Sequence, residues 1–372
     1  MSKGRLLSLV AIGFAVVVGG CLMGCGSPGP DDGRARVEDQ ELYVAPAGWL
    51  QARVRNLLPT RGSEDVSSLL GNPMPNVALP ENEGPRDYLP DSMTDWVIDV
   101  RFGGDPPLDP RRISGLFDDP AWQQRHGPMT IFALDPDKGH WTYLISADGP
   151  KQVTRLKLAW AYLDPLDENP ETSSPQVFRE RETAAREAIG PLGAAALTMS
   201  LSPDEAADRA RQLLDFKARL DYSPKLALRA PKGELFEGRE IWDVMLSLGL
   251  AWGDMDVFHW INPGEDGDDS FFSVWTSTPP GYFLPEEIAA GNVRVEDLVF
   301  GFSVPRCSRP GDVFESMARA IQYARKRLGG TIVDESGSAA DLEEIRRKVH
   351  SVEREMKSHG FRPGSHSALL LF

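Results

Sequence analysis

The feature that most constrains this chain is a strand-like run followed by a capped amphipathic helix, and it occurs twice. The first copy reads AALTMSLSPDEAADRARQLLDF and the second reads LVFGFSVPRCSRPGDVFESMARAI. In the first copy, Ser202 and Glu205 fit a capping box, with Pro203 at the first helical position. In the second copy, Asp312 is predicted to cap the helix and Gly329 to end it. The two copies therefore predict similar strand-and-helix units in the two halves of the chain.

Further strand-like segments precede each copy. WVIDVRF, MTIFALD, HWTYLIS and RLKLAWAYLD precede the first, with PDKG joining MTIFALD to HWTYLIS as a hairpin. PKLALRA, MDVFHWI and SFFSVWTS precede the second. Runs of strands with segregated helices predict an α+β fold, in which a mostly antiparallel sheet carries helices on one face. The pattern leaves open whether residues 95–221 are a degenerate copy of residues 222–372.

The chain has 372 residues, which is enough for about two domains. Residues 95–221 and 222–372 are the two predicted domains. Residues 26–94 are predicted to be a tether, because they are rich in proline, glycine and aspartate and can bury little surface. Within the tether, GWLQARVRNLL is predicted to form a short helix that docks onto the body or, as the alternative, lies against a membrane surface, and docking is preferred. Residues 1–25 are a predicted signal or anchor.

The N-terminus carries two cysteines in the pattern of a bacterial lipoprotein signal. Cys25 in LMGC and Cys21 in VGGC each follow a glycine after an apolar run, and Cys25 is the preferred lipidation site. The alternative is an uncleaved anchor, because Leu6 to Pro30 carry no charge and are long enough to span a bilayer. Lys3 and Arg5 precede the run, so the positive-inside rule places the N-terminus in the cytosol. A lipoprotein facing the periplasm is favoured over a cytosol-facing inner-membrane anchor.

Charge and cysteine content exclude several functions. The formal net charge of −15 argues against binding nucleic acid, because an acidic surface repels a phosphate backbone. Cys307 is the one cysteine of the globular part, so neither a disulfide framework nor a cysteine-based zinc site is predicted. The sequence also lacks a P-loop, a G-x-S-x-G and an H-E-x-x-H motif. No cofactor and no metal site is predicted.

Candidate catalytic residues do not converge in the predicted fold. Asp254, Asp256 and His259 have the chemistry for acid–base work or metal binding. Strand alternation places Asp256 on the opposite face from His259, and Asp254 lies in a turn, so a structural role is predicted for all three. The acidic loop GEDGDDS lacks the spacing and terminal glutamate of a calcium loop and is predicted to be a solvated hairpin. Cys307 has no neighbouring base. The protein is therefore predicted to be non-enzymatic.

The second predicted sheet offers a binding surface instead, because antiparallel sheets commonly leave one face open. Alternation separates two sets of side chains on FFSVWTS and LVFGFSV. The predicted core set is Phe272, Val274, Phe300, Phe302 and Val304. The predicted outward set is Ser273, Trp275, Ser277, Val299, Gly301 and Ser303. A shallow surface with one large ring suits a peptide laid on the sheet, unless the first half of the chain covers that face.

Residues from about 222 to 360 resemble the C-terminal domain of ZipA, a bacterial division protein whose α+β domain binds the C-terminal tail of FtsZ. The resemblance rests on LGLAWGDMDVFHW, FSVWTSTPPGYF, the Gly311-Asp312 helix start, GGTIVDE and the amphipathic last helix, in this order. It implies a split β-α-β fold, a role in division-septum assembly and a peptide partner, with the FtsZ tail as the first candidate.

The resemblance also implies a peptide groove. The positions that match it are Lys225, Met255, Val257, Trp275, Ser277, Pro279, Val299 and Gly301. Ser277 and Gly301 stand where the family carries large apolar side chains, and Pro279 stands where it carries lysine. Trp275 replaces a small residue, and either refills the groove or blocks it. FtsZ is cytosolic, so an exported lipoprotein would use the fold as an interaction module with another partner.

Overall fold

The computed structural model describes residues 57–58, 64–71, 87–103, 108–146, 149–163 and 173–372. The predicted lipidation sites Cys21 and Cys25, and the rest of the signal or anchor, lie outside these residues. Within them, no helix combines the length and the apolar character needed to cross a membrane.

The first lobe, residues 95–220, is built on a five-stranded sheet of order β3-β2-β4-β1-β5, in which every pair is antiparallel. Trp96, Ile98 and Val100 alternate toward the helices, and the Trp96 ring packs 5.2 Å from the Phe178 ring. The strands are β1 (Asp95–Phe102), β2 (Thr130–Asp135), β3 (His140–Tyr143), β4 (Arg155–Ala161) and β5 (Ala194–Met199). The helices are α2 (Pro110–Ser114), α3 (Pro120–His126), α4 (Pro175–Ile189) and α5 (Pro203–Leu220).

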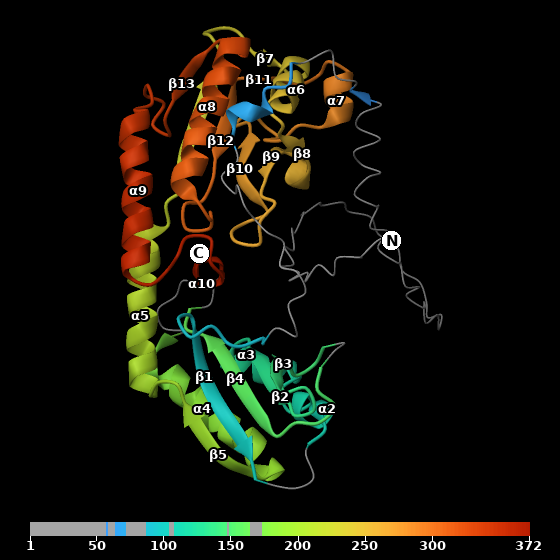
Figure 1. The fold of residues 1–372 in the computed structure, drawn as a ribbon, viewed down its shortest axis with the longest axis vertical. Coiled ribbons are helices and arrows are strands. Elements are labelled where there is room, and N and C mark those ends of the chain that lie inside the picture. Colours follow the sequence, from blue (N-terminus) through green and yellow to red (C-terminus); the bar gives the residue numbers. More distant parts are fainter. Residues whose placement is uncertain (1–56, 59–63, 72–86, 104–107, 147–148, 164–172) are drawn as a thin grey trace, which may run out of the picture. The chain divides into compact units, whose positions relative to one another are not determined.

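The second lobe, residues 222–372, is built on a six-stranded sheet of order β13-β6-β12-β10-β9-β8 (Figure 1). Its strands are β6 (Lys225–Arg229), β8 (Ala251–Trp252), β9 (Phe258–Ile261), β10 (Ser270–Trp275), β12 (Asp297–Gly301) and β13 (Thr331–Val333). A separate pair consists of β7 (Phe236–Glu237) and β11 (Arg294–Val295). The helices are α6 (Gly238–Ser247), α7 (Pro285–Ala289), α8 (Pro310–Leu328), α9 (Leu342–Ser358) and α10 (His366–Leu371).

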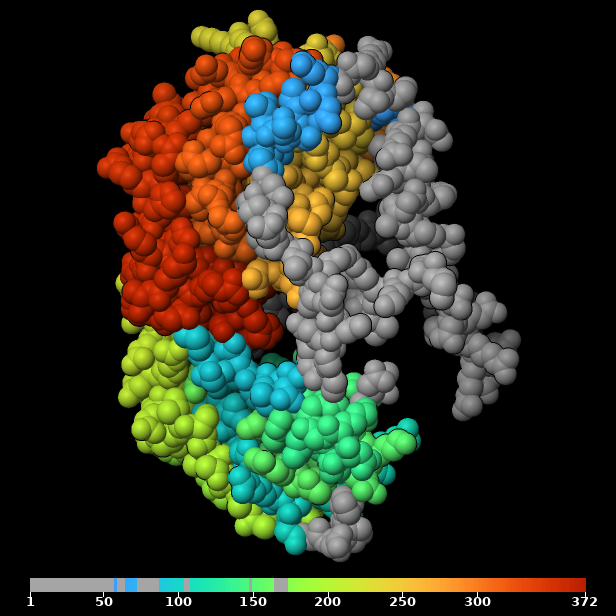
Figure 2. Space-filling view, in the orientation of Figure 1, coloured from blue at the N-terminus to red at the C-terminus, as the bar shows by residue number. Residues whose placement is uncertain are grey.

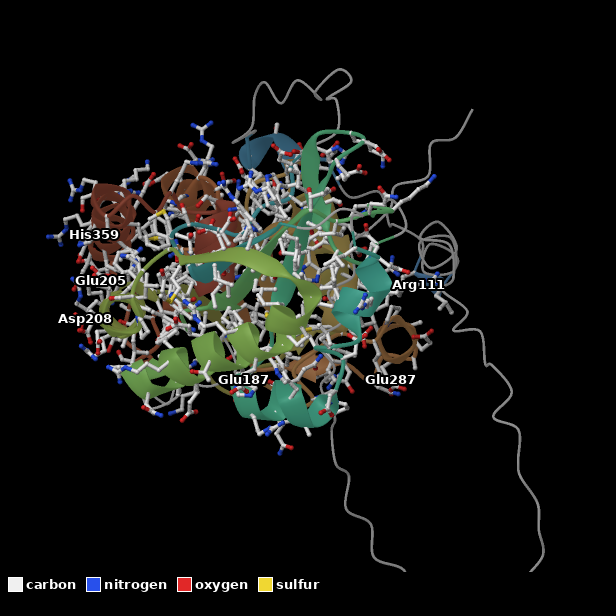
Figure 3. All side chains as sticks on the ribbon, turned by 90° about the horizontal axis from the view of Figure 1, so that it is seen from below. Arg111, Glu187, Glu205, Asp208, Glu287 and His359 are labelled. Carbon is white, nitrogen blue, oxygen red and sulfur yellow. The ribbon has the colours of Figure 1, made fainter. Side chains whose placement is uncertain are left out.

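These antiparallel sheets with their helices confirm the predicted α+β class. The capping box of α5 is also present, because Ser202 accepts from the Glu205 amide and Glu205 accepts from the Ser202 amide. The outer faces of α4 and α5 are acidic at several positions. Figure 3 shows Glu187, Glu205 and Asp208 projecting from these helices, and all three are exposed.

Two local predictions are wrong. Asp312 does not cap α8, because the helix already begins at Pro310, whose ring presets the helical φ, and Arg309 is the N-cap. Asp312 lies in the first turn and pairs with Arg309 at 2.6 Å. Strand β12 ends at Gly301, short of the predicted run LVFGFSV, although Phe302 and Val304 are buried in the core as predicted. Phe302 also lines a cavity on the outward face of the sheet.

Part of the segment predicted as a tether packs on the second lobe. A short 3-10 helix, η1 (Ser67–Leu69), lies beside α8, and Leu70 is buried. The Ser316 hydroxyl donates to the Leu70 carbonyl at 2.6 Å, and the Val66 amide donates to the Ser247 carbonyl at 2.9 Å. Figure 2 shows residues 64–71, in blue, covering part of the surface between the yellow and orange segments of the second lobe.

Candidate peptide groove on the second sheet

Strand register places the predicted outward residues on one face of β6, β12 and β10. Trp275 of β10 lies opposite Val299 of β12, and Ser273 lies opposite Gly301. Lys225 of β6 lies opposite Gly301 from the other side. Phe272, Val274 and Phe300 alternate with them and are buried. This alternation gives the sheet an apolar inner face and a partly open outer face.

Trp275 reaches diagonally across the sheet to Gly301. A Cβ atom built on Gly301 would lie 2.7 Å from Cη2 of Trp275 and 3.3 Å from Cγ of Lys225. A large aromatic side chain can reach a diagonal neighbour on the adjacent antiparallel strand. Here the ring fits only because Gly301 has no side chain to occupy the same space. The tryptophan thus fills the space above Gly301, while its exposure remains intermediate.

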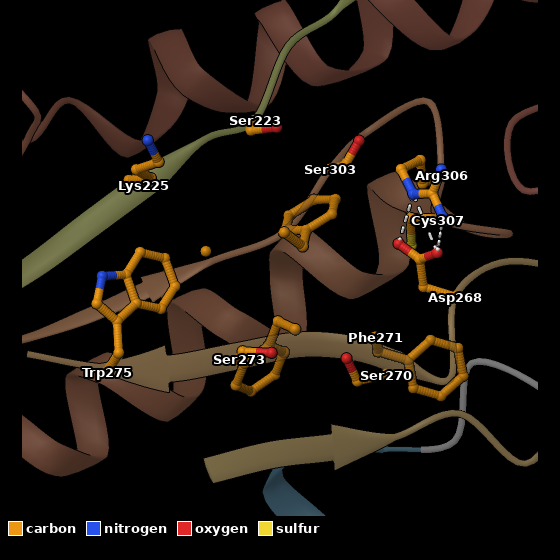
Figure 4. Close-up of a pocket in the computed structure, with 13 residues that line it drawn as sticks. Ser223, Lys225, Asp268, Ser270, Phe271, Ser273, Trp275, Ser303, Arg306 and Cys307 are labelled. Atoms are coloured by element: carbon orange, nitrogen blue, oxygen red, sulfur yellow. Dashed lines mark hydrogen bonds and ion pairs between the residues drawn. The ribbon is translucent and has the colours of Figure 1, made fainter. Parts of the chain in front are cut away.

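A cavity of about 310 Å³ opens on this face, between β10 and the chain that follows β12 (Figure 4). The strands separate there because β12 ends at Gly301 while β10 continues back to Ser270. The lining residues are Ser223, Lys225, Asp268, Ser270, Phe271, Phe272, Ser273, Trp275, Gly301, Phe302, Ser303, Arg306 and Cys307. All of them belong to the second lobe, so among the described residues the first lobe contributes nothing to the wall.

The two ends of the cavity differ in chemistry. Trp275 and Lys225 stand at one end, and the ion pair of Arg306 with Asp268 stands at the other (Figure 4). The Arg306 Nη2 atom lies 2.6 Å from Asp268 Oδ1, and Nε lies 3.0 Å from both carboxylate oxygens. Serine hydroxyls line the space between the ends. A ligand chain lying along the cavity would therefore contact an aromatic surface at one end and hydrogen-bonding groups at the other.

Met255 lies on a tight turn between β8 and β9. Its side chain is 79% exposed, and both Met255 and Asp256 have left-handed backbone, with φ of 54° and 58°. The Val257 amide donates to the Asp254 carbonyl, so residues 254–257 form a turn with two positive φ angles at its centre. Met255 is thereby held out in solvent beside the open face.

His259 fastens this turn to the sheet. Its Nε2 lies 2.8 Å from the carbonyl oxygen of Asp254, and its Nδ1 lies 2.9 Å from Oγ of Ser273. A carbonyl can only accept, so Nε2 carries the proton and, in the neutral ring, Nδ1 accepts from the serine hydroxyl. The carboxylates of Asp254 and Asp256 take no part in these two bonds, so His259 has a structural role here.

The contact between Ser273 and His259 has the atoms of a nucleophile and a base, but its setting does not suit acyl transfer. Ser273 lies in the middle of β10, paired with His259 on one side and Gly301 on the other. Neighbouring backbone N–H groups are therefore engaged in the sheet and cannot stabilise an oxyanion. Cys307, which lines the cavity beside Arg306 (Figure 4), is 5% exposed, and burial raises the pKa of its thiol to about 12, which keeps it protonated.

The structure brings only some of the predicted groove residues together. Lys225, Trp275 and Gly301 line the cavity, whereas Met255, Val257 and Val299 lie outside its wall. The other two predicted groove residues, Ser277 and Pro279, make their contacts elsewhere. The Ser277 hydroxyl and amide both donate to the Asp297 carboxylate, and Pro279 lines a separate hollow with Tyr282.

Sequence reasoning missed the polar end of the cavity. The acidic loop was expected to be solvated, but Asp268 pairs with Arg306 and Asp266 pairs with Arg362. These partners are 38 and 96 residues apart, so local spacing carried no signal for them. Within the described part of the chain, no cluster of histidine, cysteine, aspartate or glutamate has the arrangement of a metal site.

Comparison with known proteins places this lobe in context. Residues 225–350 match the family described as ZipA, C-terminal FtsZ-binding domain. Cell division protein ZipA of Marinobacter nauticus is 29% identical over 132 residues, which are 35% of this chain and 38% of the relative. Cell division protein ZipA of Ectopseudomonas mendocina is 28% identical over 122 residues, 32% of this chain and 44% of the relative. The chain thus spans less than half the length of these relatives, and the resemblance seen in the sequence is confirmed for the second lobe.

Proposed function

We propose that this chain, which is ZipA-like over residues 225–350, is a non-enzymatic cell-division protein, attached to the membrane by its N-terminal segment, whose second lobe binds the C-terminal tail of FtsZ. The observation that carries the proposal is the open outer face of β6, β12 and β10 within the segment that matches the FtsZ-binding family. Exposed Met255 and partly exposed Trp275 and Val299 supply apolar surface there.

Two positions of the proposed groove lack the large apolar side chains that a fully apolar groove would have. Gly301 offers no side chain, and Ser277 is a hydrogen-bond donor to Asp297, so neither provides apolar contact area. Burying one large apolar side chain contributes about 1.5–3 kcal/mol, so losing two such walls weakens the hold on a short peptide. The Trp275 ring above Gly301 replaces part of that area. Trp275 is therefore the residue on which peptide affinity should depend most.

Titration of a labelled FtsZ C-terminal peptide into the full chain tests the proposal. Trp275→Ala should weaken binding at least tenfold, equivalent to about 1.4 kcal/mol. Trp141→Ala is the matched control, because Trp141 is a half-buried tryptophan of the first-lobe sheet. Wild-type binding that is unchanged by Trp275→Ala would remove the groove assignment, and no binding by the wild type would remove FtsZ as the partner.

A second function is favoured by the N-terminal sequence. Cys25 and Cys21 fit a lipoprotein signal, and lipidation would place both lobes in the periplasm, where they would act as a structural or interaction module for a partner other than FtsZ. Metabolic labelling with a radioactive fatty acid tests it. Incorporation that is lost in the Cys21→Ala, Cys25→Ala double variant supports lipidation and export, whereas an unlabelled wild-type chain excludes lipidation.

A further inference from the structure

Strand β5 leaves one edge of the first sheet unpaired. Among the described residues, β5 is hydrogen-bonded to β1 alone and stands at the end of the order β3-β2-β4-β1-β5. The Ser200 amide donates to the Val97 carbonyl, so Ser200 faces β1. Since antiparallel strands alternate the direction of their backbone groups, the amides and carbonyls of Met199 and Leu197 point away from β1. A strand of another chain can pair with that edge.

The other sheet edges are short or covered. Strand β8 has two residues, and β13 has three and is bridged on its far side by Ala339. At β3, Trp141 donates its amide to the Asp87 carboxylate, and its carbonyl accepts from the Tyr88 amide. Short and covered edges are the usual protection against unwanted strand pairing. Strand β5 is longer. Its register to β1 shifts at Ala195, and the regular run from Ala196 to Met199 is left uncovered by the described residues, which indicates that this edge is used.

The chemistry around β5 fits a second copy of the same strand. From Gly190 to Pro203 the chain has no charged residue, although the whole chain carries a formal net charge of −15. Two such chains repel each other, so they approach most easily where neither presents charge. The segment also carries a row of apolar side chains that are only partly buried against the core, namely Leu192, Ala194, Leu197, Met199 and Leu201. A partner strand would complete their burial.

We propose that two copies of this chain pair antiparallel through β5 about a two-fold axis at Leu197, joining their first-lobe sheets into one ten-stranded sheet. With Leu197 opposite its own copy, Met199 lies opposite the small Ala195, and a large side chain meets a small one. The pairing uses the outward backbone groups of Leu197 and Met199. A dimer of this kind carries two peptide grooves and binds a partner with repeated tails more tightly than one copy does.

The test is the mass of the full chain in mild non-ionic detergent, measured by light scattering with correction for detergent, across a range of protein concentrations. We expect twice the monomer mass for the wild type. Leu197→Pro removes an amide that faces away from β1, so the sheet keeps its internal bonds while the free edge is blocked, and we expect a folded monomer. Leu197→Ala keeps the amide, and we expect it to remain dimeric. A monomeric wild type, or a dimeric Leu197→Pro variant, overturns the proposal.

Amide hydrogen exchange of the wild type gives a second reading that needs no variant. Exchange of the peptide covering residues 194–200 should slow as the protein concentration rises, because the dimer protects the outward amides. Exchange at that peptide that does not depend on concentration overturns the proposal even if Leu197→Pro fails to fold. The result is independent of whether the groove binds FtsZ, since neither measurement involves a peptide ligand.

Discussion

Trp275 and Gly301 depend on each other, because the ring occupies the space that a side chain at residue 301 would need. Gly301→Ala would place a methyl group 2.7 Å from Cη2 of Trp275. Overpacking of this kind costs about 1–3 kcal/mol, so we expect Gly301→Ala to lower the free energy of unfolding by that amount in urea. The same change made together with Trp275→Ala should cost much less, since the ring no longer blocks it. Strictly additive costs in the two single variants would contradict the packing relation.

Asp95, at the start of β1, makes the stability of the protein depend on pH. Burial raises the pKa of its carboxyl group, the neighbouring Asp91 carboxylate adds to the rise, and a hydrogen bond from the Asp91 amide opposes it. An acid with a raised folded-state pKa binds its proton more tightly in the native state, so its stabilising contribution is lost as pH rises from the ordinary value through the raised value.

Asp95→Asn should therefore stabilise the protein at neutral pH. Asparagine carries no charge to desolvate and still accepts from the Asp91 amide. Below pH 3.8 the carboxyl is protonated in both states, so the gain should be small there and should grow as pH rises. Urea unfolding of wild type and variant across pH measures the difference. A gain that shrinks as pH rises would show that the native state favours the charged carboxylate.

The hairpin of β8 and β9 carries a turn whose backbone geometry is unfavourable for its two central residues. Met255 and Asp256 both have positive φ, a conformation that costs an ordinary residue about 1–2 kcal/mol and that Asn-Gly adopts readily. Replacing the pair by Asn-Gly should raise the free energy of unfolding by about 1 kcal/mol. The exposed Met255 side chain is lost, so peptide affinity should fall.

If the Asn-Gly variant is more stable but binds the peptide less tightly, then the strained turn serves to present the Met255 side chain to the peptide. The changes are measured by urea unfolding and by peptide titration of the same variant. Met255→Leu is the control, because it keeps an apolar side chain in the same backbone and should change neither quantity much. A variant that is less stable than the wild type would contradict the assigned turn.

The helices and strands that could be predicted from the sequence are those in which apolar residues recur regularly over many positions. Strands such as β1 and β4 alternate cleanly, and α5 and α8 carry long apolar stripes ended by recognisable residues. The helices that start at Pro110, Pro120 and Pro285 have only five to seven residues, too few for a period of 3.6 to show. The end of β12 was missed because apolar residues continue beyond Gly301.

The site was predictable to the same extent. Alternation along β10 and β12 identified the outward positions of Trp275, Val299 and Gly301, and the register agrees. The cavity itself depends on where two strands part, and its polar end depends on an ion pair across 38 residues. Neither property is local, so neither could be found from the spacing of residues along one segment.

The two lobes share part of their strand arrangement. In each lobe the first strand lies between the last two, β1 between β4 and β5, and β6 between β12 and β13. In each lobe a long helix, α4 or α8, joins those last two strands, and another, α5 or α9, follows. The remaining strands are ordered differently. In the first lobe β4 pairs with β2 and not with β3, the strand just before it, whereas in the second lobe β12 pairs with β10, the preceding strand of the same sheet. The common part supports a duplication, which we propose as the origin of the first lobe.

The proposed function and the lipoprotein alternative differ in the side of the membrane on which the lobes would lie. FtsZ binding requires the lobes to face the cytosol, whereas lipidation at Cys25 or Cys21 sends them outside. A green fluorescent protein fused to the C-terminus folds only in the cytosol when the secretion pathway exports unfolded chains, and alkaline phosphatase becomes active only outside, where its disulfides form. The proposed function therefore predicts a fluorescent fusion, an inactive phosphatase fusion and no lipid label. An active phosphatase fusion with a lipid label that depends on the two cysteines would instead make this chain an exported lipoprotein, and the groove would need a periplasmic ligand.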